Sequence, residues 1–251
     1  MQLKASKGVG HNSGWGSGGV GRLDDRAPRN GRWEPKGGMG MRQGRIAAAV
    51  LLAVAGGSMT STFSGADPLC FGRPPTILGS PDGESIEGTS GDDVISGQGG
   101  NDVIRGLRGS DLICGGAGND RLRAGHGDGQ LGGGPGGDLV VGSPGGDKVW
   151  GGGGADRIKS GRGADYLVGG DGEDVISGGR GRDVSKGFGG ADTLGGGDGN
   201  DAEFGGPQND QVIGGSGIDD LWGGPGRDQI FGGPGVDSCQ GGEDYRICTV
   251  S

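Results

Sequence analysis

Aspartates recur at intervals of nine residues from residue 93 onward in this sequence. They hold the sixth position of a nine-residue unit that runs in one frame from Gly88 to Gln240. Regularly spaced carboxylates can supply oxygen ligands, which calcium and magnesium prefer. The candidate metal ligands are Asp93, Asp102, Asp111, Asp120, Asp138, Asp147, Asp156, Asp165, Asp174, Asp183, Asp192, Asp201, Asp210, Asp219, Asp228 and Asp237.

The rest of each unit predicts how these carboxylates are positioned. Units such as GTSGDDVIS (88–96) and GQGGNDVIR (97–105) follow the pattern G-G-x-G-x-D-x-U-x, in which U is aliphatic. The glycine-rich start favours a turn with left-handed residues, and the last three positions predict a short strand whose central side chain faces inward. Turns on one side are then 18 residues apart, and stacking places their carboxylates next to one another, where they repel. A cation between them would remove this repulsion.

This pattern resembles the RTX, or hemolysin-type, calcium-binding repeat family. The resemblance covers residues 88–240, or 79–240 if GSPDGESIE (79–87) is a degenerate first unit with Glu84 at the sixth position. It implies an all-β fold, a parallel β-roll of about 17–18 nonapeptide units in which two units form one coil. It also implies multiple Ca²⁺ ions between the stacked turns. Zinc is disfavoured because the chain has only two histidines.

Two irregularities interrupt the repeat. Gly129 stands at a sixth position, which predicts a weak seam where Asp128 substitutes only in part. Ser185 and Glu203 stand at the inward eighth position of units that are two apart. A buried carboxylate without a partner is costly. Either Glu203 is neutral or bonded to Ser185, or unit 196–204 shifts its register and turns its ninth residue inward.

A candidate binding surface follows from the outward ninth position. Four consecutive units place large apolar side chains there, and alternate units share a sheet, so these form one pair on each outer face. Flat aromatic rings suit sugars or an apolar patch of a protein partner. The alternatives are shielding of the strand backbone, self-association, or cover by residues 241–251. The four residues are Phe204, Ile213, Trp222 and Phe231.

Composition limits the function classes. Glycine accounts for 71 of 251 residues and aromatic residues for 4%, too few large side chains for a conventional enzyme core. The net charge is −9, and the acid residues concentrate after residue 66, which argues against nucleic acid as a partner. Neither H-E-x-x-H nor G-x-S-x-G occurs, so we expect no enzyme activity.

The N-terminal region differs from the repeats. Residues 1–40 are a basic, Gly/Arg-rich extension, predicted to be disordered or not translated. Residues 41–66 resemble a signal peptide, with the apolar run Ile46–Ala55 and a small-x-small cleavage site at Ser64–Ala66. The run is too short to span a membrane, so no span is expected in the mature protein. Residues 67–87 form an N-terminal cap with the degenerate repeat, 88–240 the roll, and 241–251 a C-terminal cap.

Four cysteines in a chain with the features of an exported protein favour two disulfides. Cys239 and Cys248 are nine residues apart at inward positions of consecutive units, so their bond would close the C-terminal end. Cys70 and Cys114 remain as an N-terminal clamp. The alternative is four unpaired thiols in the core.

Together these patterns predict a secreted, extracellular calcium-binding protein with a structural or binding role. The second hypothesis is an adhesion or carbohydrate-binding module that uses the outer sheet faces. The third, a polysaccharide-modifying enzyme, is disfavoured because the carboxylates already have a calcium role and no acid/base pair stands out.

Overall fold

The computed structural model describes residues 69–241 and 245–247. These residues contain twenty β-strands and no helix, so no described helix is long and apolar enough to cross a membrane. The predicted N-terminal extension and signal peptide lie outside the described residues, as do most residues of the predicted C-terminal cap.

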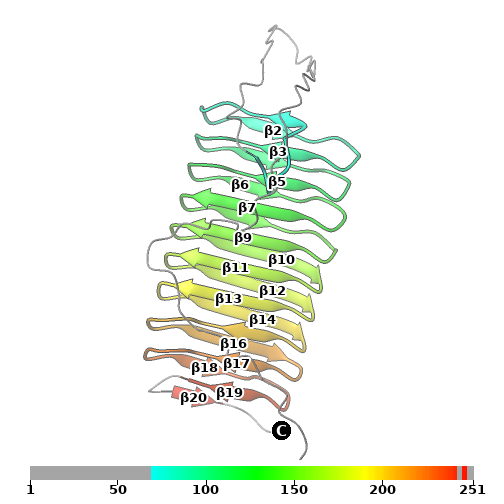
Figure 1. Ribbon diagram of the computed structural model, residues 1–251. Coiled ribbons are helices and arrows are strands. Elements are labelled where there is room, and N and C mark those ends of the chain that lie inside the picture. Colours follow the sequence, from blue (N-terminus) through cyan, green and yellow to red (C-terminus); the bar gives the residue numbers. More distant parts are fainter. Residues whose placement is uncertain (1–68, 242–244, 248–251) are drawn as a thin grey trace, which may run out of the picture. The chain divides into compact units, whose positions relative to one another are not determined.

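The strands form two parallel sheets of ten strands each, stacked turn upon turn (Figure 1). The first sheet contains β1 (Ile77–Leu78), β3 (Val94–Ser96), β5 (Leu112–Cys114), β7 (Gln130–Pro135), β9 (Lys148–Gly153), β11 (Tyr166–Asp171), β13 (Val184–Gly189), β15 (Ala202–Phe204), β17 (Asp220–Trp222) and β19 (Ser238–Gln240). The second sheet contains β2 (Ser85–Glu87), β4 (Val103–Arg105), β6 (Arg121–Arg123), β8 (Leu139–Val141), β10 (Arg157–Gly163), β12 (Val175–Gly181), β14 (Thr193–Gly199), β16 (Gln211–Ser216), β18 (Gln229–Phe231) and β20 (Tyr245–Ile247).

Neighbouring strands in each sheet pair in register at a distance of 18 residues. Ile104 lies opposite Leu122 in the second sheet, and Ile113 lies opposite Leu131 in the first. Consecutive units therefore alternate between the sheets and two units complete one coil. The predicted parallel two-sheet β-roll is confirmed.

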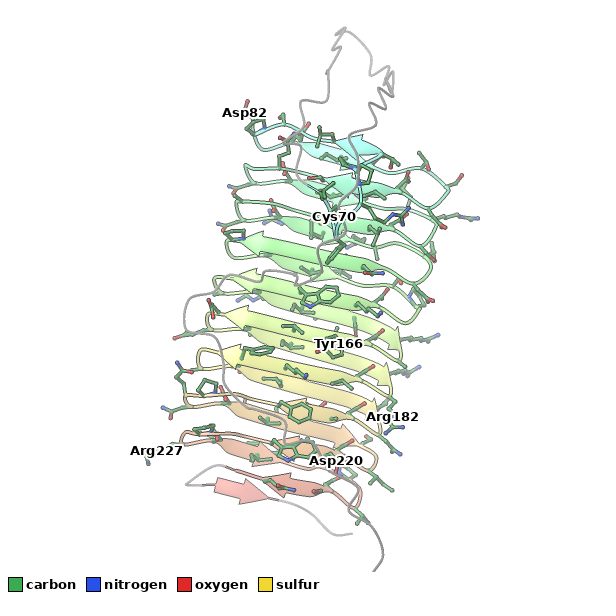
Figure 2. All side chains as sticks on the ribbon, in the orientation of Figure 1. Cys70, Asp82, Tyr166, Arg182, Asp220 and Arg227 are labelled. Carbon is green, nitrogen blue, oxygen red and sulfur yellow. A yellow bond between two sulfur atoms is a disulfide. The ribbon has the colours of Figure 1, made fainter. Side chains whose placement is uncertain are left out.

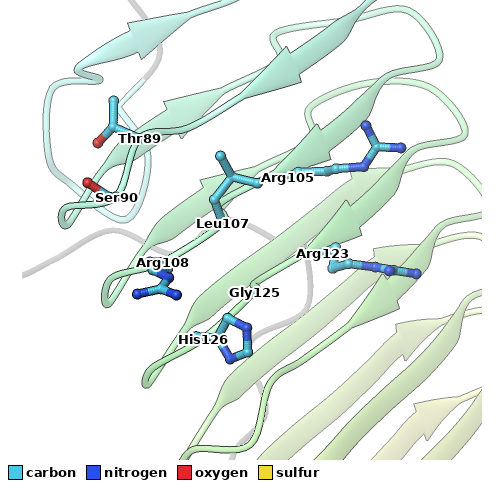
Figure 3. Close-up of a pocket in the computed structure, with 8 residues that line it drawn as sticks. All are labelled: Thr89, Ser90, Arg105, Leu107, Arg108, Arg123, Gly125 and His126. Atoms are coloured by element: carbon cyan, nitrogen blue, oxygen red, sulfur yellow. The ribbon is translucent and has the colours of Figure 1, made fainter.

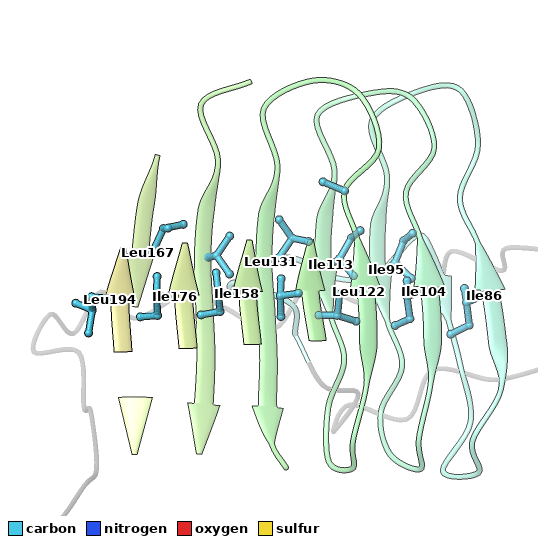
Figure 4. Packing of buried hydrophobic residues seen from close by; sticks show 13 residues of the cluster. Ile86, Ile95, Ile104, Ile113, Leu122, Leu131, Ile158, Leu167, Ile176 and Leu194 are labelled. Atoms are coloured by element: carbon cyan, nitrogen blue, oxygen red, sulfur yellow. The ribbon is translucent and has the colours of Figure 1, made fainter. Parts of the chain in front are cut away.

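The core is a line of eighth-position side chains between the two sheets. Ile104, Leu122 and Ile158 lie in this line (Figure 4) and are almost completely buried. One hydrophobic cluster extends from Ile86 to Leu194, and a separate one begins at Val212. The predicted inward direction of the eighth position is confirmed. The hydrophobic core is interrupted between the two clusters.

Glycine is needed in the turns because the second and fourth positions are usually left-handed. Gly179 and Gly181, for example, have φ angles of 110° and 140°. A side chain is strained in this region, whereas glycine adopts it freely. The backbones of stacked turns also approach closely there, since a Cβ on Gly181 would collide with the carbonyl oxygen of Gly163 in the preceding coil.

The N-terminal end contains more regular structure than the repeat pattern alone predicts. β2 coincides with the last three positions of unit 79–87, as expected for a degenerate first unit. β1 adds a further half coil, with Ile77 opposite Ile95. A disulfide joins Cys70 to Cys114, with their Cα atoms 5.7 Å apart, which confirms the predicted N-terminal clamp.

The C-terminal end departs from the nine-residue frame. That frame places residue 248 opposite Ile230, but the structure pairs Arg246 with Ile230. The last connection is thus two residues shorter than in the regular coils, which corrects the predicted register of unit 241–249. Cys239 is disulfide-bonded, and its predicted partner Cys248 lies outside the described residues.

Candidate calcium sites

The predicted ligands form a ladder of hydrogen bonds along each side of the roll. The amide of Asp102 donates to Oδ1 of Asp120, and the amide of Asp120 donates to Oδ1 of Asp138, both at 2.8 Å. Every predicted ligand except Asp93 accepts such a bond from the residue 18 positions earlier, at 2.6–3.1 Å. This bond fixes the direction of each carboxylate.

The second carboxylate oxygen is different, because in most units it is buried without a hydrogen-bond partner. Fourteen of the sixteen candidate aspartates share this property. They are Asp102, Asp111, Asp120, Asp138, Asp156, Asp165, Asp174, Asp183, Asp192, Asp201, Asp210, Asp219, Asp228 and Asp237. A buried anionic oxygen without a partner is costly, so each one requires a positively charged ligand or a proton.

Each such Oδ2 except that of Asp165, whose unit begins with Ser160, borders a space that we call the turn cradle. It is bounded by the first-position glycine of the same unit, the Oδ2 of that unit and the first-position carbonyl oxygen of the next coil. At Gly178, the place of a Cβ would lie 2.5 Å from Oδ2 of Asp183 and 2.7 Å from the carbonyl oxygen of Gly196. A first-position side chain would fill the cradle, which explains the glycine.

The donor set of a turn cradle fits a hard cation. It combines a carboxylate oxygen with a carbonyl oxygen from the adjacent coil, and calcium accepts both in a flexible arrangement. Within the described residues, no group of three or more His, Cys, Asp or Glu side chains is placed to hold a metal. Any cation in these turns would therefore depend on backbone carbonyls as much as on side chains.

Burial sets the electrostatics of the ladder. It raises the pKa of Asp156 to about 7, while the hydrogen bond from the Asp138 amide lowers it and the neighbouring carboxylates raise it. The same balance, with burial as the largest cause, gives a pKa of about 6 at Asp138, Asp183, Asp192 and Asp210. Without a cation, burial therefore makes the charged form of these carboxyls less favourable than in an exposed aspartate.

Two predicted ligands lie in turns that are capped by protein donors. Oδ2 of Asp93 accepts hydrogen bonds from the amide and hydroxyl of Thr89, at 2.6 and 3.0 Å. Oδ2 of Asp147 accepts them from the amide and hydroxyl of Ser143, at 2.6 and 3.1 Å. The repeat pattern alone does not predict this difference, although a hydroxyl residue at the second position instead of glycine marks both turns in the sequence.

The irregularity at Gly129 occurs together with a departure at the first position of the same unit. The ladder breaks there because Gly129 offers no carboxylate to the amide of Asp111, 18 residues earlier. The first position of the same unit is Ala124, whose methyl carbon would lie 3.0 Å from a Cβ on Gly129. Asp128 instead accepts the amide of Gly146 in an exposed turn, so it does not replace the missing ligand.

The irregularity at Ser185 and Glu203 does not change the register of the strands. Ser185, Glu203 and Leu221 lie opposite one another in the first sheet, and both polar side chains are 0% exposed. The predicted alternative in which the ninth residue of unit 196–204 turns inward is therefore wrong. Neither Glu203 oxygen nor the Ser185 hydroxyl has a hydrogen-bond partner, so these two side chains are not bonded to each other.

The third alternative for Glu203, a neutral carboxyl, agrees with its surroundings. Burial is the largest cause that raises its pKa to about 9, and the carboxylates of Asp201, Asp219 and Asp183 raise it further. In the absence of a cation, this carboxyl is therefore protonated at neutral pH.

The predicted outer surface is longer than the sequence analysis proposed. In the first sheet, the rings of Phe204 and Trp222 stack at 4.5 Å with an interplanar angle of 2°. Lys186 lies over both Phe204 and Tyr166, at 5.8 and 5.4 Å from the ring centroids. Tyr166 lies on the same outer face (Figure 2), and the centroid of its ring is 6.5 Å from that of Trp150.

This aromatic row continues to the N-terminal segment, where Phe71 meets Trp150 at 5.1 Å. Trp150 was recognisable in the sequence, because it stands at the ninth position in the same frame as Phe204. In the second sheet, Ile213 lies opposite Phe231 as predicted, and Ile213 is 37% exposed.

A separate hollow of about 630 Å³ lies near the N-terminal coils (Figure 3). Four basic side chains line it, Arg105, Arg108, Arg123 and His126, and its lining includes no carboxylate. It therefore offers no carboxylate acid/base pair for glycoside chemistry. His126 is exposed and lies outside the turn cradles.

Comparison with known proteins agrees with this geometry. A model of the RTX calcium-binding nonapeptide repeat matches residues 78–113, 113–131, 132–167, 150–185, 168–202 and 204–244. No curated protein matches the chain significantly. The matched segments cover more than half of the sequence and coincide with the stacked coils. The chain belongs to the RTX calcium-binding repeat family.

Proposed function

We propose that this chain is a secreted calcium-binding repeat protein whose β-roll folds when Ca²⁺ binds between its stacked turns. The observation that carries this proposal is the set of fourteen buried Oδ2 atoms without partners. Thirteen of the fourteen lie beside the first-position glycine of their unit, and ten of these cradles also contain a carbonyl oxygen of the next coil. Ca²⁺ would supply the charge that these oxygens lack, and it would link adjacent coils.

All sixteen sixth-position aspartates belong to this proposal, but not equally. The fourteen with an open Oδ2 would contact the ions directly. Asp93 and Asp147 would bind more weakly, because Thr89 and Ser143 already satisfy their oxygens. The role we propose is structural or binding rather than enzymatic, because the buried carboxylates are committed to the cradles.

Export is supported by two observations. The Cys70–Cys114 disulfide favours an oxidising compartment, where such bonds persist. The apolar run Ile46–Ala55, with basic residues before it and small residues after it, has the layout of a secretory signal.

Calcium should determine whether the roll is folded. In a calcium-free buffer at pH 7.5, the full chain is expected to show mostly coil by circular dichroism, since its carboxylates repel one another. In millimolar calcium it should gain β structure and a cooperative thermal transition, whereas equal concentrations of magnesium should have little effect. A fully β-structured protein in chelator would contradict the proposal.

Acid should partly replace calcium. Burial raises the pKa of Asp156 to about 7 and those of Asp138, Asp183, Asp192 and Asp210 to about 6, so protonation stabilises the metal-free fold. That stability should be greatest below pH 4 and be lost as the pH rises through 6 to 7. Thermal melts of metal-free protein between pH 4 and 8 measure this trend.

The aspartate variants provide the control for this trend. Asp156→Asn, which resembles the protonated form, should reduce the loss of metal-free stability above pH 6, while a change at the exposed turn residue, Asp82→Asn, should not. Equal pH profiles for the parent and Asp156→Asn would disprove the role of burial. In saturating calcium the trend should reverse, because protons compete with the metal.

The capped turn at Asp147 gives a test of the cradle geometry. In Ser143→Gly, the hydroxyl is lost and the second position can become left-handed, so Oδ2 of Asp147 becomes available. We expect about one additional bound calcium per chain, counted by native mass spectrometry. Ser216→Gly changes an exposed serine at the end of β16 and should leave the count unchanged. Identical counts in both variants would show that capping does not control occupancy.

A second candidate function, carbohydrate binding, is favoured by the row of aromatic rings on the first sheet. Phe204 and Trp222 stack in parallel, and Lys186 bridges the space between Phe204 and Tyr166. Such a flat and partly exposed surface suits the apolar faces of sugar rings. The second-sheet pair Ile213 and Phe231 is smaller and offers one aromatic ring.

Glycan binding in saturating calcium tests this candidate. The double variant Phe204→Ser, Trp222→Ser should lose retention on a glycan array that the parent protein shows. Val175→Ser, which changes an exposed apolar residue on the second sheet, should retain it. If the parent binds no glycan, or if the double variant binds as well as the parent, the carbohydrate hypothesis is wrong.

A further inference from the structure

Glu203 is the one acidic residue at an eighth position of the core. Its side chain is 0% exposed, and neither of its carboxylate oxygens has a hydrogen-bond partner. The hydrophobic core is divided at this residue, because one cluster ends at Leu194 and the next begins at Val212. A leucine would continue the core, so the carboxylate needs a compensating interaction.

The carboxylate of Glu203 reaches the turn cradle of its own unit. The place of a Cβ on Gly196 would lie 2.5 Å from Oδ2 of Asp201, 2.5 Å from Oε1 of Glu203 and 2.6 Å from the carbonyl oxygen of Gly214. Three oxygens, two of them from carboxylates, therefore converge beside Gly196.

The neighbouring cradles lack this third oxygen. Beside Gly178, the nearest groups are the carboxylate of Asp183 and the carbonyl of Gly196, with no atom of Ser185 among them. Beside Gly214, they are the carboxylate of Asp219 and the carbonyl of Gly232. The second carboxylate thus distinguishes the Gly196 cradle from those directly before and after it in the same sheet.

We propose that Glu203 is a direct cation ligand that, together with Asp201 and the Gly214 carbonyl, forms a dicarboxylate calcium site of higher affinity than the regular turns. This inference rests on the proposed calcium-binding function and deepens it at one cradle. Additional ligand charge strengthens calcium binding. The same ion removes the cost of a carboxylate in the core, and the site bridges two coils because Gly214 belongs to the next one.

The competing explanation is a neutral carboxyl that merely fills space in the core. The two explanations differ in their dependence on calcium. A space-filling carboxyl is replaced by leucine with a gain in stability in any buffer. A calcium ligand is replaced by leucine with a gain only in metal-free protein, and with a loss of binding when calcium is present.

The test compares Glu203→Gln and Glu203→Leu with the parent by calcium titration calorimetry, native mass spectrometry and thermal melts. At pH 7, both variants should lose the tightest binding step, either as one ion fewer or as a weakening of 10- to 100-fold. Ser185→Ala removes the neighbouring unpartnered hydroxyl without touching a cradle, so it should bind calcium as the parent does. Unchanged binding in Glu203→Gln would overturn the inference.

A measurement on the parent protein keeps the inference testable if the variants fail to fold. The chain has six glutamates, so their side-chain carboxyl carbons can be followed by ¹³C NMR. In calcium-loaded protein at pH 7, the Glu203 signal should have the shift of an ionised, metal-bound carboxylate. The shift of a protonated carboxyl would overturn the inference. A parent that binds no calcium would instead refute the proposed function itself.

Discussion

The rest of the roll depends on one unbalanced interaction, the burial of a carboxylate in each turn. The backbone amide of the preceding coil satisfies Oδ1, as between Asp102 and Asp120. Oδ2 has no such partner in the described residues of most units. The turn therefore has a fixed geometry but an incomplete charge balance, and a cation that completes it also joins two coils. Under the proposed function, folding and ion binding would be parts of one equilibrium.

Much of this arrangement was predictable because the repeat reduces the fold to one dimension. A period of nine residues determines which side chain faces the core, and a distance of 18 determines which strands pair. Ile104 opposite Leu122 and the aspartate ladder follow directly. The hydrophobic pattern also identified Glu203 as an exception, since no other acidic residue occupies an inward position of the frame.

The remaining features depend on interactions outside the repeat rule. Whether Asp147 has an open oxygen depends on the turn conformation at Ser143, which the frame does not specify. The departures from the repeat at Ala124 and Gly129 can be related only through the proximity of these two residues in the structure. The chain ends have no periodicity, so the contact between Phe71 and Trp150 and the shortened connection before β20 required the structure. The sequence period describes the interior of the roll better than its ends.

The two faces of each strand are under different constraints. Inward positions must fill the same narrow core in every coil, whereas outward positions can vary without affecting the repeat. Functions that are specific to this protein are therefore expected on the outer faces. The exception is β15, where both sides of the strand depart from the repeat pattern. Glu203 points into the core and Phe204 stacks on Trp222 outside. An ion held by Glu203 would fix β15, which carries Phe204 of this ring pair, so occupancy of one interior site would stabilise the aromatic surface on the outer face of the same strand.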